Sequence, residues 1–137
     1  MAMANSNYRR DKIPMWINII SIVIIAILLF QMYACYFNPS LAYGAFENSD
    51  ANRQAILTLA GRNLVMIVVT LFALKSQNAM FFTFTFLMAL VRETYDMILV
   101  GYLNHFSAQG IGMMATFLVF LIPYVFAMKK LRQLDLG

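Results

Sequence analysis

The chain has 137 residues, of which 62% are hydrophobic and 12% are charged. A soluble domain carries about 25% charged residues, so this composition argues against a water-soluble domain and predicts one integral membrane domain, residues 1–137. The formal charge of +4 does not indicate a nucleic-acid-binding protein, because the basic residues stand at the ends of apolar runs. The single cysteine, Cys35, excludes an internal disulfide and a multi-cysteine metal site, and no metal site is predicted.

Four apolar runs follow one another along the chain, at about residues 13–37, 55–74, 79–102 and 110–128. A transmembrane helix needs about 20 apolar residues, so each run is long enough to span a bilayer. The sequence therefore predicts an all-α fold, a four-helix transmembrane bundle with antiparallel neighbours. Phe and Thr alternate over residues 81–86 as they would in a strand, but a lone strand in lipid leaves its backbone unpaired, so we expect a helix there.

The segments between the runs contain capping and turn residues. Residues 38–54 are predicted to form a loop, in which Ser49 or Asp50 caps the second helix. Residues 75–78 read Lys-Ser-Gln-Asn and predict a tight turn, which makes the second and third helices antiparallel neighbours. Gly61, inside the second run, is expected to permit close contact with another helix.

Basic residues distinguish the two faces of the predicted membrane domain. Seven of them lie near the termini or in the 75–78 turn, whereas the opposite face holds Arg53 beside two acidic residues. Cytoplasmic segments are enriched in Lys and Arg, so both termini are predicted to be cytoplasmic. The seven residues are Arg9, Arg10, Lys12, Lys75, Lys129, Lys130 and Arg132.

Each predicted helix carries polar side chains in the outer half of the membrane. At about 1.5 Å per residue, most of them lie about 9–10 Å from the outer end of their helix, and Arg92 and Glu93 lie at about 14–15 Å. Arg92, Glu93 and Asp96 share an arc of about 100° and can all face the bundle interior. The candidate layer consists of Gln31 in the first helix, Arg62 and Asn63 in the second, Arg92, Glu93, Tyr95 and Asp96 in the third, and Thr116 in the fourth.

The charges of the third run make that helix marginal by itself. Its ten Leu, Ile, Phe and Val residues between Phe81 and Val100 favour insertion by roughly 3–6 kcal/mol, whereas Arg92 and Asp96 oppose it by about 5–7 kcal/mol before Glu93 is counted. The helix therefore needs partners. Arg62 of the second helix would supply a partner by pairing with Asp96 or Glu93. Arg92 and Asp96 can also pair within the third helix itself.

Two interpretations of this polar layer stay open. The charges either fix helix register and packing, or they handle a ligand or an ion, which is the usual role of ionisable groups inside a membrane. The leading functional hypothesis is that the layer binds a polar or amphipathic ligand, such as a lipid or quinone headgroup. Arg62 and Arg92 would hold an anionic or carbonyl group of the ligand, and Glu93 and Asp96 would neutralise and orient them.

Two other classes of function fit the same residues. A small proton-coupled transporter would use Glu93 as its membrane carboxylate. An accessory or structural subunit would present an outer helical face to a larger membrane partner or to a second copy of the chain. No nucleophile–base pair is visible in the sequence, so it assigns neither an enzymatic reaction nor a cofactor.

Residues 59–103 resemble the middle of the small DoxX-like four-helix membrane proteins and their uncharacterised bacterial relatives. The resemblance rests on Gly61-Arg62 in the second helix, a short turn, and Asp96 late in the third helix. It implies an integral four-helix bundle in the bacterial inner membrane. Some DoxX-type proteins are associated with quinone-linked sulfur oxidation, but the resemblance does not transfer a reaction to this chain. Arg92-Glu93 adds charges that the family pattern does not lead one to expect.

Overall fold

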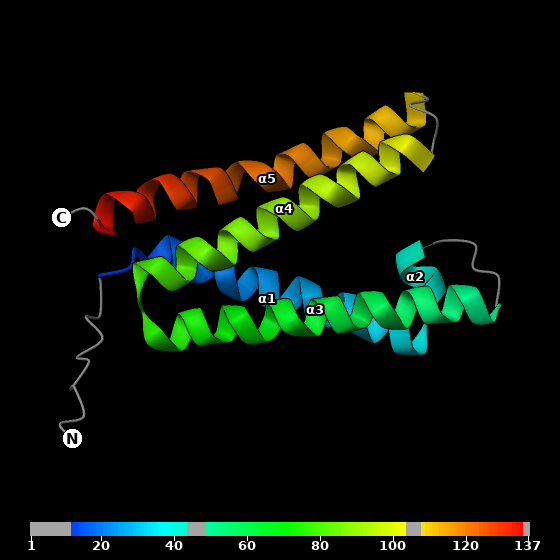
Figure 1. The fold of residues 1–137 in the computed structure, drawn as a ribbon, viewed down its shortest axis with the longest axis horizontal. Helices are drawn as coiled ribbons and strands as arrows, with labels where there is room; N and C mark the ends of the chain where they lie inside the picture. The colour runs from blue at the N-terminus through cyan, green and yellow to red at the C-terminus, as the bar shows by residue number, and fades with distance from the viewer. Residues whose placement is uncertain (1–11, 44–48, 104–107, 136–137) are drawn as a thin grey trace, which may run out of the picture. The chain divides into compact units, whose positions relative to one another are not determined.

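The computed structural model describes residues 12–43, 49–103 and 108–135, and every regular element in these ranges is an α-helix (Figure 1). The prediction of an all-α fold is therefore confirmed. The helices are α1 (Met15–Phe37), α2 (Pro39–Tyr43), α3 (Asp50–Ser76), α4 (Ala79–Leu103) and α5 (Ala108–Asp135). They fall into two compact units, of which one comprises Met15–Leu74 (the α1–α3 unit) and the other contains α4 and α5 (the α4–α5 unit).

Hydrogen bonds to side chains fix where α3 and α4 begin. The Ser49 hydroxyl accepts from the backbone N–H of Asn52 at 3.3 Å, which confirms Ser49 as a cap and starts α3 five residues earlier than predicted. Gln77 then adopts a left-handed backbone with φ of 49°, the usual way to end a helix. The Asn78 side chain accepts from the backbone N–H of Met80 at 2.9 Å and caps α4. The predicted turn at residues 75–78 is thus reduced to Gln77 and Asn78.

The segment predicted as a loop after the first helix contains the short helix α2. Pro39 disfavours continuation of α1 but suits the first position of a new helix, where its missing N–H costs nothing. The Asn38 carbonyl accepts from the backbone N–H of Leu41 at 3.0 Å, and the Asn38 side chain accepts from the Ser40 hydroxyl at 2.5 Å. The prediction of a loop over all of residues 38–54 was therefore wrong for residues 39–43, and also for residues 50–54, which form the start of α3.

Buried side chains in α1 and α3 recur every three or four residues. This 3.5-residue period keeps one line of each helix against a partner, as in a coiled coil. Cys35 of α1 packs with Ile56 and Ala60 of α3, and Met32 covers this cluster. The buried line of α1 includes Ile17, Ser21, Ile24 and Leu28, and the buried line of α3 includes Ile56, Ala60, Asn63, Ile67 and Thr70.

Helices α4 and α5 form an antiparallel hairpin and run side by side (Figure 1). The ring of Phe86 lies 5.8 Å from that of Tyr124, centroid to centroid, and 6.5 Å from that of Phe82. The Thr85 hydroxyl donates to the carbonyl oxygen of Phe81 at 2.8 Å, so this buried polar group is satisfied inside its own helix. The alternating Phe and Thr residues are therefore helical, as predicted. The buried line of α4 includes Ala79, Phe82, Phe86 and Ala89.

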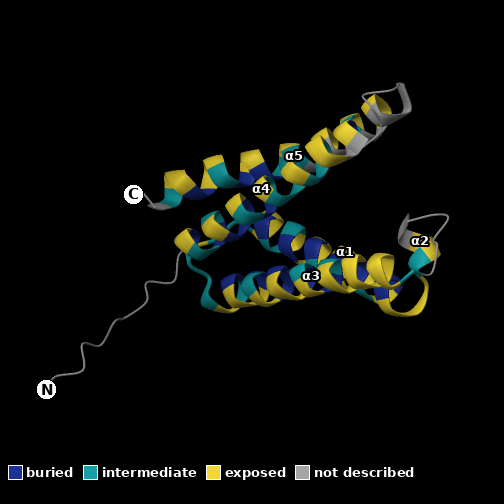
Figure 2. Cartoon of the chain, turned by 45° about the vertical axis from the view of Figure 1, so that its right-hand side comes forward, coloured by how far each residue is buried: buried dark blue, intermediate teal, exposed yellow. Residues whose placement is uncertain are grey.

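Two of the helices, α1 and α3, are long and apolar enough to cross a membrane. Large apolar side chains remain exposed on both, in bands that alternate with the buried lines (Figure 2). Helix α4 is long enough as well, but every 18-residue stretch of it contains Arg92, Glu93 and Asp96. Several side chains of α5, the fourth predicted span, lie outside the described residues.

Within the α1–α3 unit, Gly61 does not make the close helix contact that its small size suggested. A Cβ atom added at this position would meet nothing within 4 Å, and the residue is exposed. The buried line of α3 passes through its neighbour Ala60 instead, so tight packing of Gly61 against α1 is excluded.

Candidate functional site

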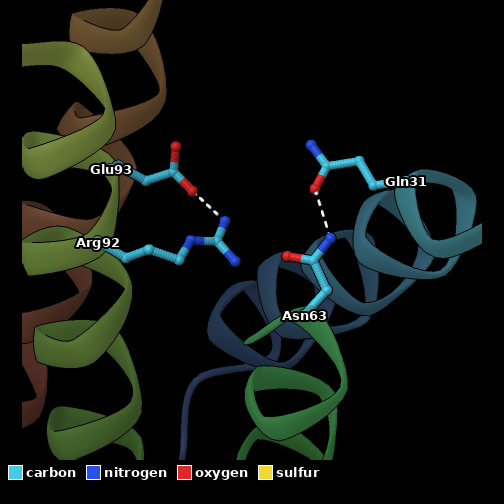
Figure 3. Close-up of polar contacts among 4 residues, drawn as sticks. All are labelled: Gln31, Asn63, Arg92 and Glu93. Carbon is cyan, nitrogen blue, oxygen red and sulfur yellow. Dashed lines mark hydrogen bonds and ion pairs between the residues drawn. The ribbon is translucent and has the colours of Figure 1, made fainter. Parts of the chain in front are cut away.

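The polar contact of the α1–α3 unit joins Asn63 to Gln31. The Asn63 amide Nδ2 donates to Gln31 Oε1 at 3.1 Å (Figure 3). Both residues continue the buried lines of their helices, since Gln31 follows Leu28 by three residues and Asn63 follows Ala60 by three. Asn63 is 1% exposed, so its amide needs hydrogen-bond partners within the protein. The contact joins one polar side chain of each helix, whereas the buried Ser21 and Thr70 hydroxyls donate to carbonyl oxygens within their own helices.

Arg62 lies beside this line. Successive residues of a helix are turned by about 100°, so Arg62 and Asn63 project in different directions, and Arg62 is half-buried. Arg62 was expected to have the larger role because of its charge, but Asn63 is the buried residue. The spacing of four, three and four residues between Ile56, Ala60, Asn63 and Ile67 could have shown this from the sequence.

The predicted pairing of Arg62 with Asp96 or Glu93 would join the two units. Arg62 belongs to the α1–α3 unit, and both acidic residues belong to the α4–α5 unit. This pairing therefore stays a prediction.

The polar site of the α4–α5 unit is the ion pair between Arg92 and Glu93. The Arg92 Nη2 atom contacts Glu93 Oε1 (Figure 3). Their side chains are 16% and 13% exposed. Glu93 follows Ala89 by four residues and so continues the buried line of α4, while the long Arg92 side chain reaches round to it. The sequence analysis did not predict this pair, because adjacent residues on a helix ordinarily do not face each other.

The remaining candidates of the layer differ in their surroundings. Asp96 follows Glu93 by three residues and is half-buried. Tyr95 is 60% exposed and projects away from the buried line. Thr116 belongs to α5, but its side chain lies outside the described residues.

Tyr124 of α5 belongs to the same hairpin as the ion pair, although it was not selected from the sequence. The residue is 8% exposed, and its ring packs on that of Phe86 at 5.8 Å between centroids. Tyr124, Ala127 and Leu131 are all buried, and their spacing of three and four residues places Tyr124 on the inner face of α5. The α4–α5 hairpin therefore contains a carboxylate, a guanidinium and a phenol that are all largely buried.

These groups can bind oxygen-rich ligands and offer no set of metal ligands. Among the described residues, no three His, Cys, Asp or Glu side chains are grouped so that they could hold a metal ion. A guanidinium has five N–H donors, and a phenol both donates and accepts a hydrogen bond. The arrangement suits a phosphate, carboxylate or carbonyl group whose orientation must be fixed.

The chain matches no family model, no curated protein and no solved structure. The resemblance to DoxX-like proteins therefore stays a prediction.

Proposed function

We propose that this chain is a small integral protein of the bacterial inner membrane, and that its Arg92–Glu93 pair binds the polar headgroup of an amphipathic ligand such as a lipid or a quinone. The observation that carries the proposal is an ion pair only 16% and 13% exposed, placed near the middle of the 25-residue helix α4. Ionisable groups at such positions are costly, and they commonly mark ligand or ion sites in membranes.

The apolar surfaces of the α1–α3 unit support insertion into a bilayer. Ile22, Val23 and Phe30 of α1 are 50–58% exposed, and Val65 and Val68 of α3 are 53% and 57% exposed. A helix that is apolar on its outer face as well as its inner face suits a lipid environment. In the proposed topology four helices span the membrane with both termini in the cytoplasm.

The chemistry of the ion pair suits a polar group that arrives from the lipid phase. Arg92 would donate to a phosphate or carbonyl oxygen of the ligand, since a guanidinium can hold a second acceptor beside a carboxylate. Glu93 would keep the site neutral in the absence of ligand. The Tyr124 hydroxyl would add one further donor or acceptor.

Membrane insertion and topology can be tested separately from ligand binding. The full chain is expected to stay in the membrane pellet after alkaline carbonate extraction. A green fluorescent protein fused to the C-terminus should fluoresce, whereas alkaline phosphatase fused at the same place should be inactive. Release by carbonate, or an active phosphatase fusion, would contradict the proposed topology.

Ligand binding is tested by extraction of the purified protein. Protein purified from bacterial membranes in a mild detergent is expected to retain a specific lipid or quinone, identified by mass spectrometry of its organic extract. The charge-neutral double variant Arg92→Gln/Glu93→Gln should lose that molecule, and Lys130→Gln, an exposed change elsewhere in the unit, should keep it. Equal retention by the wild type and the double variant, with unchanged helical circular dichroism, would refute the proposed function.

A further inference from the structure

The α4–α5 unit has a second feature, a groove between the first turns of α4 and the last turns of α5. It encloses about 720 Å³, a size typical of small-molecule sites. Its walls are mainly apolar, and two cationic side chains belong to its lining. The residues that matter here are Phe81, Phe84 and Leu87 of α4 and Met128, Lys129 and Arg132 of α5.

The charged and apolar parts of the groove are separated along the helix axis. Lys129 and Arg132 are three residues apart and so lie on one side of α5, in its exposed final turns. Because α4 and α5 are antiparallel, this end of α5 adjoins the start of α4. Phe84 and Leu87 lie about 4.5 Å and 9 Å further along α4 than Phe81, at ~1.5 Å per residue.

We propose that this groove binds an anionic phospholipid of the inner leaflet. Lys129 and Arg132 hold the phosphate, and Phe84 and Leu87 contact an acyl chain. The charge of the two cations selects an anionic headgroup, and the apolar walls select a lipid over a free phosphate ion. Phe84 is 57% exposed and Leu87 is 42% exposed, so an acyl chain can reach both. The inference rests on the membrane insertion proposed above, but not on ligand binding at Arg92 and Glu93.

The test measures retention of lipids by the full chain in detergent, by native mass spectrometry. Dioleoyl phosphatidylglycerol is the anionic probe and dioleoyl phosphatidylcholine the zwitterionic one. Each basic side chain near an anionic lipid strengthens binding by about fivefold, so Lys129→Gln/Arg132→Gln should weaken phosphatidylglycerol binding by about 25-fold. The matched control Lys75→Gln/Lys130→Gln removes the same charge from exposed residues outside the groove lining, and it should bind as the wild type does.

A second variant tests the apolar wall. Leu87→Trp fills the groove at a partly exposed position and leaves both cations in place, so it should also lose phosphatidylglycerol. An excess of inorganic phosphate should not displace the lipid from the wild type. Three results would overturn the proposal: equal weakening by the two double variants, unchanged binding by Leu87→Trp, or displacement by inorganic phosphate.

The comparison of the two double variants separates the groove from the proposed ligand site. Arg92 and Glu93 do not line the groove and are intact in both variants, so loss of phosphatidylglycerol from Lys129→Gln/Arg132→Gln alone is assigned to the groove. Release of the wild type by alkaline carbonate would instead remove the membrane insertion on which both proposals depend.

Discussion

The hydrogen bond between Gln31 and Asn63 can be tested by a double-mutant cycle. Asn63 is 1% exposed and Gln31 is half-buried, so the two single changes should differ in cost. Gln31→Leu removes an acceptor from the fully buried Asn63 amide and should lower the free energy of unfolding by about 1–2 kcal/mol. Asn63→Leu leaves behind the Gln31 amide, which is only half-buried, and it should lower the free energy of unfolding by about 0.5–1 kcal/mol.

The double variant Gln31→Leu/Asn63→Leu should recover most of the lost stability. Two apolar side chains then pack on the buried lines of α1 and α3, and no buried amide loses its partner. The expected coupling energy is about 1 kcal/mol, within the range measured for hydrogen bonds between transmembrane helices. Unfolding in mixed detergent micelles, followed by helical circular dichroism, measures each variant. If the stability losses of the two single variants add up to that of the double variant within about 0.3 kcal/mol, the contact contributes no coupling energy. That result would refute the reasoning.

A control for this cycle is Thr58→Val. Thr58 is exposed, and its hydroxyl donates to the Gln54 carbonyl oxygen at 2.9 Å within the same helix. This change should alter stability by less than about 0.5 kcal/mol. A larger loss would mean that any removal of a polar group from α3 is destabilising, whether or not it is paired with α1.

Five further changes test the helix ends and the exposed glycine in the same unfolding assay. Asn78→Ala should lower the free energy of unfolding by about 1 kcal/mol, and Ser49→Ala should lower it by less. The reason is that the capping hydrogen bond of Asn78 is 2.9 Å long, whereas that of Ser49 is 3.3 Å long. The reverse order would contradict this ranking. Gln77→Gly should stabilise the protein by about 0.5–1 kcal/mol, since glycine adopts the left-handed backbone without strain, whereas Ser76→Gly in the last turn of α3 should destabilise it. Gly61→Ala should stabilise α3 by up to about 1 kcal/mol, because a Cβ meets nothing there; a loss of stability would reveal a contact made by this face of α3.

Much of the fold follows from local features of the sequence. Long apolar runs bounded by polar residues predict the long helices, and Ser49 and residues 75–78 predict where two of them begin or end. The short helix α2 was missed because residues 38–54 were predicted as a loop, although Pro39 also suits the first position of a helix. Helix α5 extends to Asp135, beyond the predicted end at about residue 128. Hydrophobicity marks only the part of a helix that can span a membrane, and α5 continues through the basic residues that follow.

The site was predicted less well, because charge and composition do not reveal which way a side chain points. Glu93 was selected for its charge and lies in an ion pair, but with its neighbour Arg92 and not with a residue one turn away. Tyr124 was passed over because a tyrosine in an apolar run has no special pattern by itself. Its place near Glu93 depends on the register of α4 against α5, which arises from packing between the two helices.

The charges within α4 also bear on when each helix enters the membrane during synthesis. In the proposed membrane, α1 and α3 can leave the translocon as soon as each emerges, because apolar residues dominate both. Helix α4 gains too little from its own side chains to do so. The segment between α4 and α5 comprises residues 104–107, so its hairpin partner follows almost at once. Entry of α4 would therefore be delayed until α5 has been translated, and the second half of the chain would insert as a pair.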